Sequence, residues 1–178
     1  MIIRNLGNLI SNLYLYLMAI IYHPTPIGFA RIEDDDSNIV CSVTVREAAG
    51  EDATQPSPGI LTVIRQLDEY FAGERRIFDF PFRQKGSDFQ QDVWERLRDI
   101  PYGKTLSYAQ LSKNMNNPLA IRAIASANGK NNLWIVVPCH RVIGSDGSLT
   151  GYAGGLWRKK WLLEHETRVT GVGQASLF

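Results

Sequence analysis

Hydrophobic and polar residues alternate along two segments in the first third of the chain. The first segment is Ile27–Glu33 and the second is Asn38–Arg46, with acidic residues at 34–36 between them. An alternation of period two predicts half-buried β-strands. One face of the second strand is expected to carry Ile39, Cys41, Val43 and Val45. Cys41 is therefore interpreted as a small core residue.

A helical pattern follows a linker at residues 55–59, which contains proline and glycine. Its apolar residues are Ile60, Leu61, Ile64, Leu67 and Phe71. Gly73 then marks the end of the helix. Alternating Phe78, Phe80 and Phe82 predict a third strand. Together these segments predict a small sheet-plus-helix domain over residues 18–84.

The second half of the chain has a mainly helical pattern. Ser87 and Gln90 have the spacing of a capping box, which predicts the start of a helix. The apolar face of this helix is expected to hold Phe89, Val93, Leu97 and Ile100. Pro101 and Gly103 end it. We therefore expect an α+β protein whose second domain, residues 85–168, is mostly helical.

A pair of short helices is predicted inside this second domain. The first spans Ser107–Lys113, and the second starts at Pro118 with Asn117 as its cap and stops at Gly129. These are the proportions of a helix-turn-helix, although a helical hairpin that binds nothing has the same proportions. Small residues on the second helix would allow a DNA backbone to approach: Ala120, Ala123, Ala125 and Ser126. Tight helix packing would explain them equally well.

Composition narrows the class of protein. The 178 residues are 44% hydrophobic and 21% charged, which excludes wholesale disorder, collagen and coiled coil. The net charge of +1 hides an asymmetry, because residues 1–88 hold 8 basic and 12 acidic residues, whereas residues 89–178 hold 11 and 6. A basic second half favours a polyanionic partner. Two cysteines are too few for a disulfide scaffold and favour a reducing compartment.

The two ends of the chain are expected to lie outside these domains. The apolar run Leu9–Tyr22 is too short to cross a bilayer as a helix, and no small-residue cleavage site follows it. Met18 offers a second start. We expect residues 1–17 to be a non-structural extension, with a secretion signal and a peripheral amphipathic contact as the alternatives. Residues 169–178 are expected to form a flexible tail.

The strongest candidate for chemistry lies after the apolar run at residues 133–137, which predicts an extended buried segment. Cys139 and His140 follow, and a thiol beside an imidazole is a candidate nucleophile. An unperturbed thiol has a pKa of about 8.5, so it needs a nearby base or cation. Adjacent strand residues point to opposite faces, so His140 would need a bend or a bridging water. An inert buried thiol beside a surface histidine is the alternative.

The segment NGKNNLWIVVPCHRVIGSDGSLTGYAGGLWRKKWLLEHE resembles the active-site region of the O6-alkylguanine-DNA alkyltransferases, also called methylated-DNA–protein-cysteine methyltransferases. The resemblance extends upstream through FQQDVWERLRDIPYGKTLSYAQL. It covers residues 86–166 strongly and residues 20–84 loosely, as the N-terminal domain of that family. The PCHRV pentapeptide at this distance from GYAGG is highly specific.

The resemblance implies roles for four residues around the thiol. Cys139 matches the alkyl acceptor, and His140 matches the base that deprotonates it through a water molecule. Glu166 matches the carboxylate that orients the imidazole. Asn131 matches the asparagine that braces the turns of the site. Asn132 replaces a frequent proline of the family, which predicts a looser turn.

The resemblance also implies how the damaged base is held. Tyr108 and Arg122 match the pair that extrudes the nucleotide, with the tyrosine beside its phosphate and the arginine in the vacated stack. The backbone N–H of Ala153 would face O6, and the carbonyls of Cys139 and Val142 would accept from the guanine amino group. Further residues match the lining of the guanine pocket: Tyr152, Gly154 and Lys159.

The implied reaction is DNA repair by a single transfer. Thiolate attack at the alkyl carbon gives a thioether, which has no easy hydrolytic exit, so each molecule reacts once. We expect no cofactor and no metal, because Cys41 is the only other thiol. The expected partner is double-stranded DNA carrying O6-alkylguanine, with O4-alkylthymine left open as a second substrate. A cytoplasmic monomer with no membrane contact is expected.

Two rival functions belong to other classes. Relatives that sense lesions without transferring the alkyl group carry tryptophan where this chain has Cys139. A cysteine hydrolase would turn over, but nothing in the sequence resembles a peptide or ester pocket.

Overall fold

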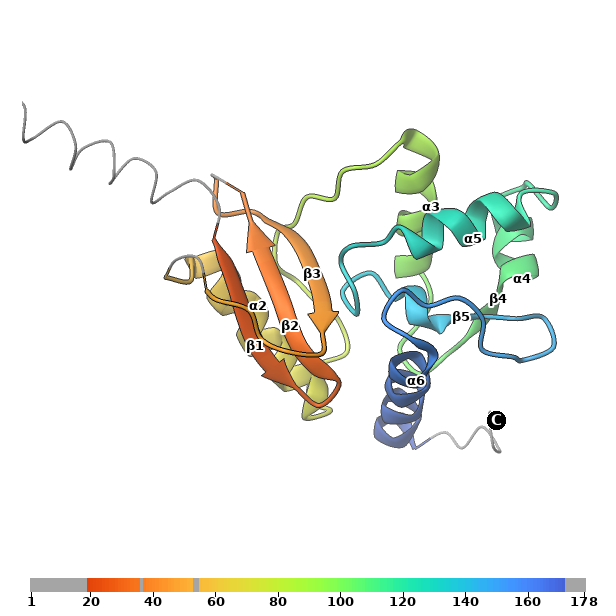
Figure 1. Cartoon of the computed structure of the whole chain (residues 1–178). Coiled ribbons are helices and arrows are strands. Elements are labelled where there is room, and N and C mark those ends of the chain that lie inside the picture. Colours follow the sequence, from red (N-terminus) through yellow and green to blue (C-terminus); the bar gives the residue numbers. More distant parts are fainter. Residues whose placement is uncertain (1–18, 36, 53–54, 172–178) are drawn as a thin grey trace, which may run out of the picture.

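The computed structural model describes residues 19–35, 37–52 and 55–171. Figure 1 shows a small sheet with one helix against it, followed by a body of helices around a shorter pair of strands. The chain therefore mixes helices and strands, as predicted. Within the described ranges, none of the helices has the length and apolar character that a bilayer span requires. The expectations for residues 1–17 and for 172–178 lie outside the described residues.

The first sheet has three antiparallel strands in sequence order: β1 (Ile20–Thr25), β2 (Gly28–Asp34) and β3 (Val40–Arg46). A tight turn joins Thr25 to Gly28, whose φ of 117° and close approach to the Arg46 carbonyl exclude a side chain. Helix α2 (Pro58–Phe71) packs against the sheet (Figure 1). Apolar side chains of the sheet are buried here: Ala30, Ile32, Val43 and Val45.

Two of the three predicted strands are confirmed, and the third is wrong. The third strand of the sheet is β1 and not the predicted strand at residues 78–82. Phe82 only bridges Val40, and Phe78, Phe80 and Phe82 pack ring against ring in series instead. Alternation along three phenylalanines thus reflects a segment that meets the sheet at a single bridge and adds no strand to it.

Cys41 lies at an irregularity of the sheet. Val40 pairs with Asp34 and Ser42 pairs with Glu33, so Cys41 is the extra residue of a β-bulge. The bulge shifts the alternation. Val40 is buried, whereas Cys41 is only partly buried. The expectation that Cys41 is a core residue is therefore wrong.

Local signals fixed the helix boundaries well in most places. The Ser57 hydroxyl caps α2, and Gly73 ends it with a φ of 82°. Leu61, expected on the buried face, is 52% exposed. The capping box of Ser87 and Gln90 is confirmed at the start of α3 (Asp88–Arg98).

The two short helices are α4 (Tyr108–Asn114) and α5 (Ile121–Gly129). A second capping box, between Ser107 and Gln110, starts α4. The predicted start of the second helix at Pro118 is wrong. Residues 117–120 form a turn in which the N–H of Ala120 donates to the carbonyl of Asn117 over 3.0 Å. Helix α5 also packs against α3, where the indole of Trp94 donates to the Ala127 carbonyl over 2.9 Å.

The segment before Cys139 differs most from the prediction. Residues 133–137 do not form an extended run, because Ile135 has a φ of 73° and the N–H of Val137 donates back to Leu133. Cys139 then begins a 3-10 turn, η1 (Cys139–Arg141), ahead of β5 (Val142–Ile143). Strand β5 pairs in parallel with β4 (Leu106–Ser107).

Helix α6 (Leu156–Thr170) closes the described chain. Gly171 ends it in the left-handed conformation, with a φ of 64°. The helix thus runs past Arg168, and the predicted tail boundary at residue 169 is too early.

Backbone bonds tie the segment before Cys139 to the first sheet. The N–H of Val43 donates to the carbonyl of Asn132, and the N–H of Trp134 donates to the carbonyl of Val43, each over 2.8 Å. The side chain of Asn132 also donates to the Cys41 carbonyl over 3.0 Å. A proline could not make this side-chain bond, so the substitution predicted to loosen the turn adds an anchor.

Candidate active site

Cys139 is a buried thiol, only 3% exposed, at the start of η1. Burial raises the pKa of Cys139 to about 11, and a hydrogen bond from Asn131 and the charge of Lys159 oppose that rise. The thiol is therefore protonated at neutral pH. It can act as a nucleophile only when another group accepts its proton.

His140 has one ring nitrogen engaged and one free. Its Nε2 lies 2.8 Å from Oε1 of Glu166, and both side chains are completely buried. Since an ionised carboxylate only accepts hydrogen bonds, Nε2 carries the proton. The other nitrogen, Nδ1, is buried without a hydrogen-bond partner among the described residues. Burial lowers the pKa of His140 against the raising influence of Glu166, which leaves a neutral imidazole with a free lone pair.

The path from the thiol to the imidazole is indirect. Among the described residues, no hydrogen bond joins the Cys139 thiol to the imidazole ring of His140, because Nε2 binds Glu166 and Nδ1 has no partner. Cys139 and His140 lie on a 3-10 turn. The prediction that they lie on a strand, with their side chains on opposite faces, is therefore wrong. The predicted bridging water remains compatible with the geometry.

Glu166 is held by bonds from several segments. Arg141 donates to both of its oxygens, and the N–H of Gly103 donates to Oε2 over 2.9 Å. The hydroxyl of Tyr70 donates to Oε1 over 2.8 Å. Burial by itself would raise the pKa of Glu166, but the charges and hydrogen bonds of His140 and Arg141 hold it well below its usual range. The carboxylate is therefore ionised at any physiological pH.

Asn131 joins the turn before the cysteine to the linker before α3. Its Oδ1 accepts from the N–H of Leu133 over 2.9 Å and from the side chain of Gln84 over 2.8 Å. Its amide donates to the Val137 carbonyl over 2.8 Å. These bonds are compatible with the bracing role predicted for Asn131.

The predicted base pocket is closed in this structure. A cavity of about 10 Å³ adjoins Cys139, which is room for about one water molecule and not for a purine. Tyr152 covers it, with its ring centroid 5.4 Å from that of Trp134. Its lining includes the predicted Tyr152 and Ala153 together with Asn128, Gly129, Asn131, Trp134 and Gly151.

Lys159, predicted to line the base pocket, does not line this cavity and is completely buried. Its Nζ donates to the Val142 carbonyl over 2.6 Å and to the Thr150 carbonyl over 2.8 Å. Burial lowers the pKa of Lys159 to about 8, and Cys139 opposes that shift. Gly154 also accepts a side-chain bond at its carbonyl, from Arg158 over 2.6 Å.

The predicted nucleotide-handling residues lie on α4 and α5. The amide of Asn128 donates to the Tyr108 hydroxyl over 3.0 Å and to the Cys139 carbonyl over 3.4 Å, which places Tyr108 beside the thiol. Arg122 is exposed on the first turn of α5, and among the described residues it makes no hydrogen bond to Cys139, His140 or Glu166, which together form the relay. Of the predicted DNA-contacting residues, Ala123 and Ser126 are exposed and Ala120 is partly buried against the core.

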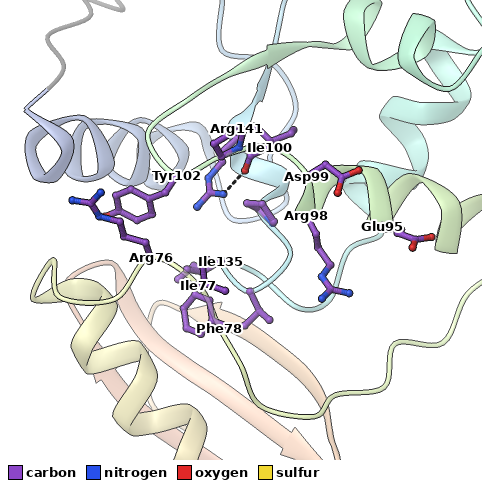
Figure 2. Close-up of a pocket in the computed structure, with 13 residues that line it drawn as sticks. Arg76, Ile77, Phe78, Glu95, Arg98, Asp99, Ile100, Tyr102, Ile135 and Arg141 are labelled. Carbon is purple, nitrogen blue, oxygen red and sulfur yellow. Dashed lines mark hydrogen bonds between the residues drawn. The ribbon is translucent and has the colours of Figure 1, made fainter.

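A larger cleft of about 620 Å³ lies next to the relay. Figure 2 shows Arg76, Ile77 and Phe78 on one side of it, with Arg98 at the end of α3 and the following Asp99 on another. Its inner wall includes Arg141, whose guanidinium donates to the Ile100 carbonyl over 2.7 Å. Cys139 does not line the cleft, so the cleft gives no access to the thiol.

Sequence reasoning missed four polar residues that support the site: Tyr70, Gln84, Asn128 and Arg141. Arg141 stands inside the PCHRV motif, so that motif could have identified it. Tyr70 lies 96 residues from Glu166 along the chain, and no local pattern connects the two. Within the described ranges there is no cluster of three or more histidine, cysteine, aspartate or glutamate side chains that could hold a metal ion.

Comparison with known proteins agrees with this geometry. Residues 88–168 match the family described as 6-O-methylguanine DNA methyltransferase, DNA binding domain. The constitutive methylated-DNA–protein-cysteine methyltransferase of Bacillus subtilis is 41% identical over 153 residues, covering 82% of this chain and 93% of that protein. The methyltransferase of Methanosarcina acetivorans is 52% identical over 102 residues. That match covers 57% of this chain and 65% of the relative, slightly under two thirds of its length.

Solved structures show the same overall arrangement. The O6-methylguanine methyltransferase of Mycobacterium tuberculosis superposes with a TM-score of 0.76 at 39% identity, covering 90% of this chain and 98% of that one. A Mycobacterium tuberculosis OGT structure in complex with DNA gives a TM-score of 0.75 at 41% identity, covering 83% and 92%. The mixed helix-and-strand fold predicted from the sequence is thus confirmed.

A buried cysteine backed by a histidine–carboxylate pair, beside two short helices, defines a protein with one buried thiol near a proton acceptor and near a candidate DNA-binding surface. The similarity to the Bacillus subtilis protein extends over nearly its full length. This chain belongs to the methylated-DNA–protein-cysteine methyltransferase family.

Proposed function

We propose that this protein repairs DNA by moving the alkyl group of O6-alkylguanine onto the sulfur of its own Cys139. The observation that carries the proposal is the buried arrangement of Cys139, His140 and Glu166. Here a protonated thiol lies near an imidazole whose free Nδ1 can take its proton. Family membership supports the same reaction.

The reaction exchanges the thiol proton for the alkyl group. Nδ1 of His140 accepts the proton through a water molecule, and Glu166 stabilises the resulting imidazolium. The Sγ atom then attacks the alkyl carbon. The S–C bond forms as the C–O6 bond breaks, and the bonding electrons stay on the guanine. The guanine takes up the proton that the thiol lost, by way of His140 and water, and leaves neutral.

The product limits the protein to one turnover. A thioether on Cys139 is stable to hydrolysis, so the thiol is not regenerated. The protein therefore acts as a stoichiometric reagent, with one alkyl group accepted per chain and no cofactor.

Admission of the base requires the pocket to open. A cavity of about 10 Å³ cannot hold a purine, so residues 144–155 must move away from Cys139. Three glycines with positive φ give this segment backbone freedom: Gly147, Gly151 and Gly155. After opening, Tyr152, Gly154 and Lys159 line the pocket, the N–H of Ala153 faces O6, and the carbonyls of Cys139 and Val142 accept from the guanine amino group.

DNA binds across α4 and α5, used as a helix-turn-helix. The exposed face of α5 presents small side chains at Ala123 and Ser126 to the groove, with Ala120 at the edge of that face. The reactive atom of a stacked base is shielded, so the nucleotide must leave the duplex. Arg122 fills the vacated stack, and Tyr108 lies beside the phosphate of the extruded nucleotide. The partner is double-stranded DNA, and the protein acts as a cytoplasmic monomer.

A label-transfer experiment tests the proposal. Duplex DNA carrying radiolabelled O6-methylguanine is incubated with wild-type protein, Cys139→Ala and the matched thiol variant Cys41→Ala. We expect one label per chain on wild type and on Cys41→Ala, and none on Cys139→Ala. Tight binding with the label left on the DNA would instead identify a lesion-sensing protein. Released methanol over several turnovers would contradict the single-transfer mechanism.

A further inference from the structure

Tyr70 connects the first domain to the buried relay. It lies in the last turn of α2 and is completely buried, and its hydroxyl donates to Oε1 of Glu166 over 2.8 Å. The family match that contains Cys139, His140 and Glu166 begins only at residue 88. Tyr70 therefore brings a group from outside the matched domain into contact with the carboxylate.

The hydroxyl and the imidazole share one oxygen. His140 Nε2 and the Tyr70 hydroxyl both donate to Oε1, each over 2.8 Å. Burial raises the pKa of Tyr70 well above its usual value, so the phenol keeps its proton and remains a donor. A hydrogen bond between a neutral donor and a carboxylate is charge-assisted and directional. It fixes the position of Oε1 and spreads part of its negative charge.

Packing holds the phenol in place. Its ring lies against His165 and Tyr102, with centroid distances of 5.4 Å and 5.8 Å. The backbone carbonyl of Tyr70 accepts from Nε2 of His165 over 2.8 Å, which anchors α2 on α6. The ring packing and the bond between α2 and α6 therefore hold the Tyr70 hydroxyl in position to donate to Glu166.

We propose that Tyr70 is a positioning residue for the alkyl transfer, acting through Glu166 to set the orientation and basicity of His140. The inference rests on the proposed function. Without the hydroxyl, Oε1 would lose one donor and carry more negative charge, while Arg141 and the Gly103 N–H would still hold the carboxylate. The imidazolium would be stabilised, so His140 would hold a proton at higher pH and would meet the thiol less often in the productive orientation.

Other titratable groups lie around the relay, and Tyr102 among them is a phenol that makes no hydrogen bond to it in the described residues. These groups come from the turn after Cys139, from the loops before β4 and before α6, and from α6 itself: Arg141, Tyr102, Tyr152 and Lys159. The Tyr70→Phe substitution keeps all of these groups in the chain, so the comparison with wild type and with Tyr102→Phe isolates the effect of the Tyr70 hydroxyl.

The test compares Tyr70→Phe with Tyr102→Phe in the full chain. Both changes delete one phenol oxygen near Glu166, but the buried Tyr102 hydroxyl has no hydrogen-bond partner among the described residues. Single-turnover alkylation by free O6-benzylguanine is measured across the acidic pH range. We expect Tyr70→Phe to react about tenfold more slowly, as for loss of a hydrogen bond to a charged group. The acidic midpoint of its rate profile should move to higher pH. Tyr102→Phe should match wild type in both respects.

The outcomes separate this inference from the proposed function. Equal rates and midpoints for Tyr70→Phe and wild type would overturn the positioning role while leaving the transfer reaction standing. An equal slowing in both variants, with no shift of the midpoint, would also overturn it, because loosened packing would then explain the effect. No alkylation of wild-type protein would refute the proposed function itself. Rates are read well below the unfolding temperature of each variant, so that reduced stability does not imitate the effect.

Discussion

The side chain of Asn128 donates to the hydroxyl of Tyr108 over 3.0 Å and thereby links the end of α5 to the start of α4. Because the amide occupies an acceptor site on the phenol, the Tyr108 proton stays free to donate, although Tyr108 does not line the cavity beside Cys139. Asn128 is itself buried and lines that cavity. The pair therefore connects α4 and α5 to the cavity beside Cys139.

Asn128→Ala should weaken both the fold and the reaction. Loss of the bonded amide should cost about 1–2 kcal/mol in the free energy of unfolding, measured with urea. Transfer from duplex DNA should slow in single-turnover assays, because Tyr108 loses its orientation. Asn114→Ala, at the exposed end of α4, is the control and should behave as wild type. Unchanged transfer in Asn128→Ala would show that Tyr108 needs no such support.

Arg122→Ala separates base extrusion from chemistry. Arg122 is exposed on α5 and, among the described residues, makes no hydrogen bond to the relay, so its loss should leave the reaction with free O6-benzylguanine unchanged. Repair of duplex DNA should slow by roughly tenfold or more, because unstacking a base costs a few kcal/mol that the inserted side chain offsets. Lys113→Ala, an exposed cation on α4, controls for loss of charge. Equal losses on both substrates would contradict an extrusion role.

Glu166→Gln tests the buried carboxylate as a stabilising charge. Removing one partner of a buried ion pair costs about 3–5 kcal/mol, so the variant should unfold at much lower urea concentration at pH 7. The pKa of Glu166 is lowered in the folded state, so its contribution is present above the ordinary value of 4.5 and is lost as pH falls below it. The stability gap between wild type and Glu166→Gln should therefore narrow at acidic pH. A gap independent of pH would contradict the role of the charge.

The thiol of Cys139 should lose its proton only at an unusually high pH. Its pKa is raised to about 11 by burial, so alkylation by iodoacetamide in a Cys41→Ala background should rise with a midpoint near that value. The unfolded chain should show an ordinary midpoint near 9.0. By linkage, the buried neutral thiol stabilises the fold fully below pH 9 and loses that contribution as pH rises through about 11. A folded-state midpoint below 9 would mean that the thiol is activated before substrate arrives.

The sequence predicted best where a few neighbouring residues decide the structure. Ser87 and Gln90 start α3 because both partners of the capping box lie within one helical turn. The prediction that the second helix starts at Pro118 is wrong, because a turn satisfies the backbone preferences of proline as well as a first helical turn does. The φ of Ile135 is set by the surrounding structure against the preference of a β-branched residue, so no propensity predicts it.

In the site, too, local motifs predicted some residues, and long-range packing placed others that the sequence did not indicate. Cys139, His140 and Glu166 could be placed from motifs, and the structure brings the histidine and the glutamate into direct contact. Tyr70 could not be placed from the sequence, because its contact depends on how α2 docks on α6. Long-range packing of this kind leaves no periodic signal in either segment.

Two capping boxes allow a matched test of how α4 positions the site. Ser87 caps α3 and Ser107 caps α4, each through its hydroxyl and a glutamine three residues later. Replacing either serine by alanine should lower the free energy of unfolding by about 1 kcal/mol. Only Ser107→Ala should also slow transfer from duplex DNA, because Tyr108 is the first residue of the helix that Ser107 caps. Equal transfer rates in the two variants, at equal stability loss, would show that the start of α4 does not position Tyr108 for the reaction.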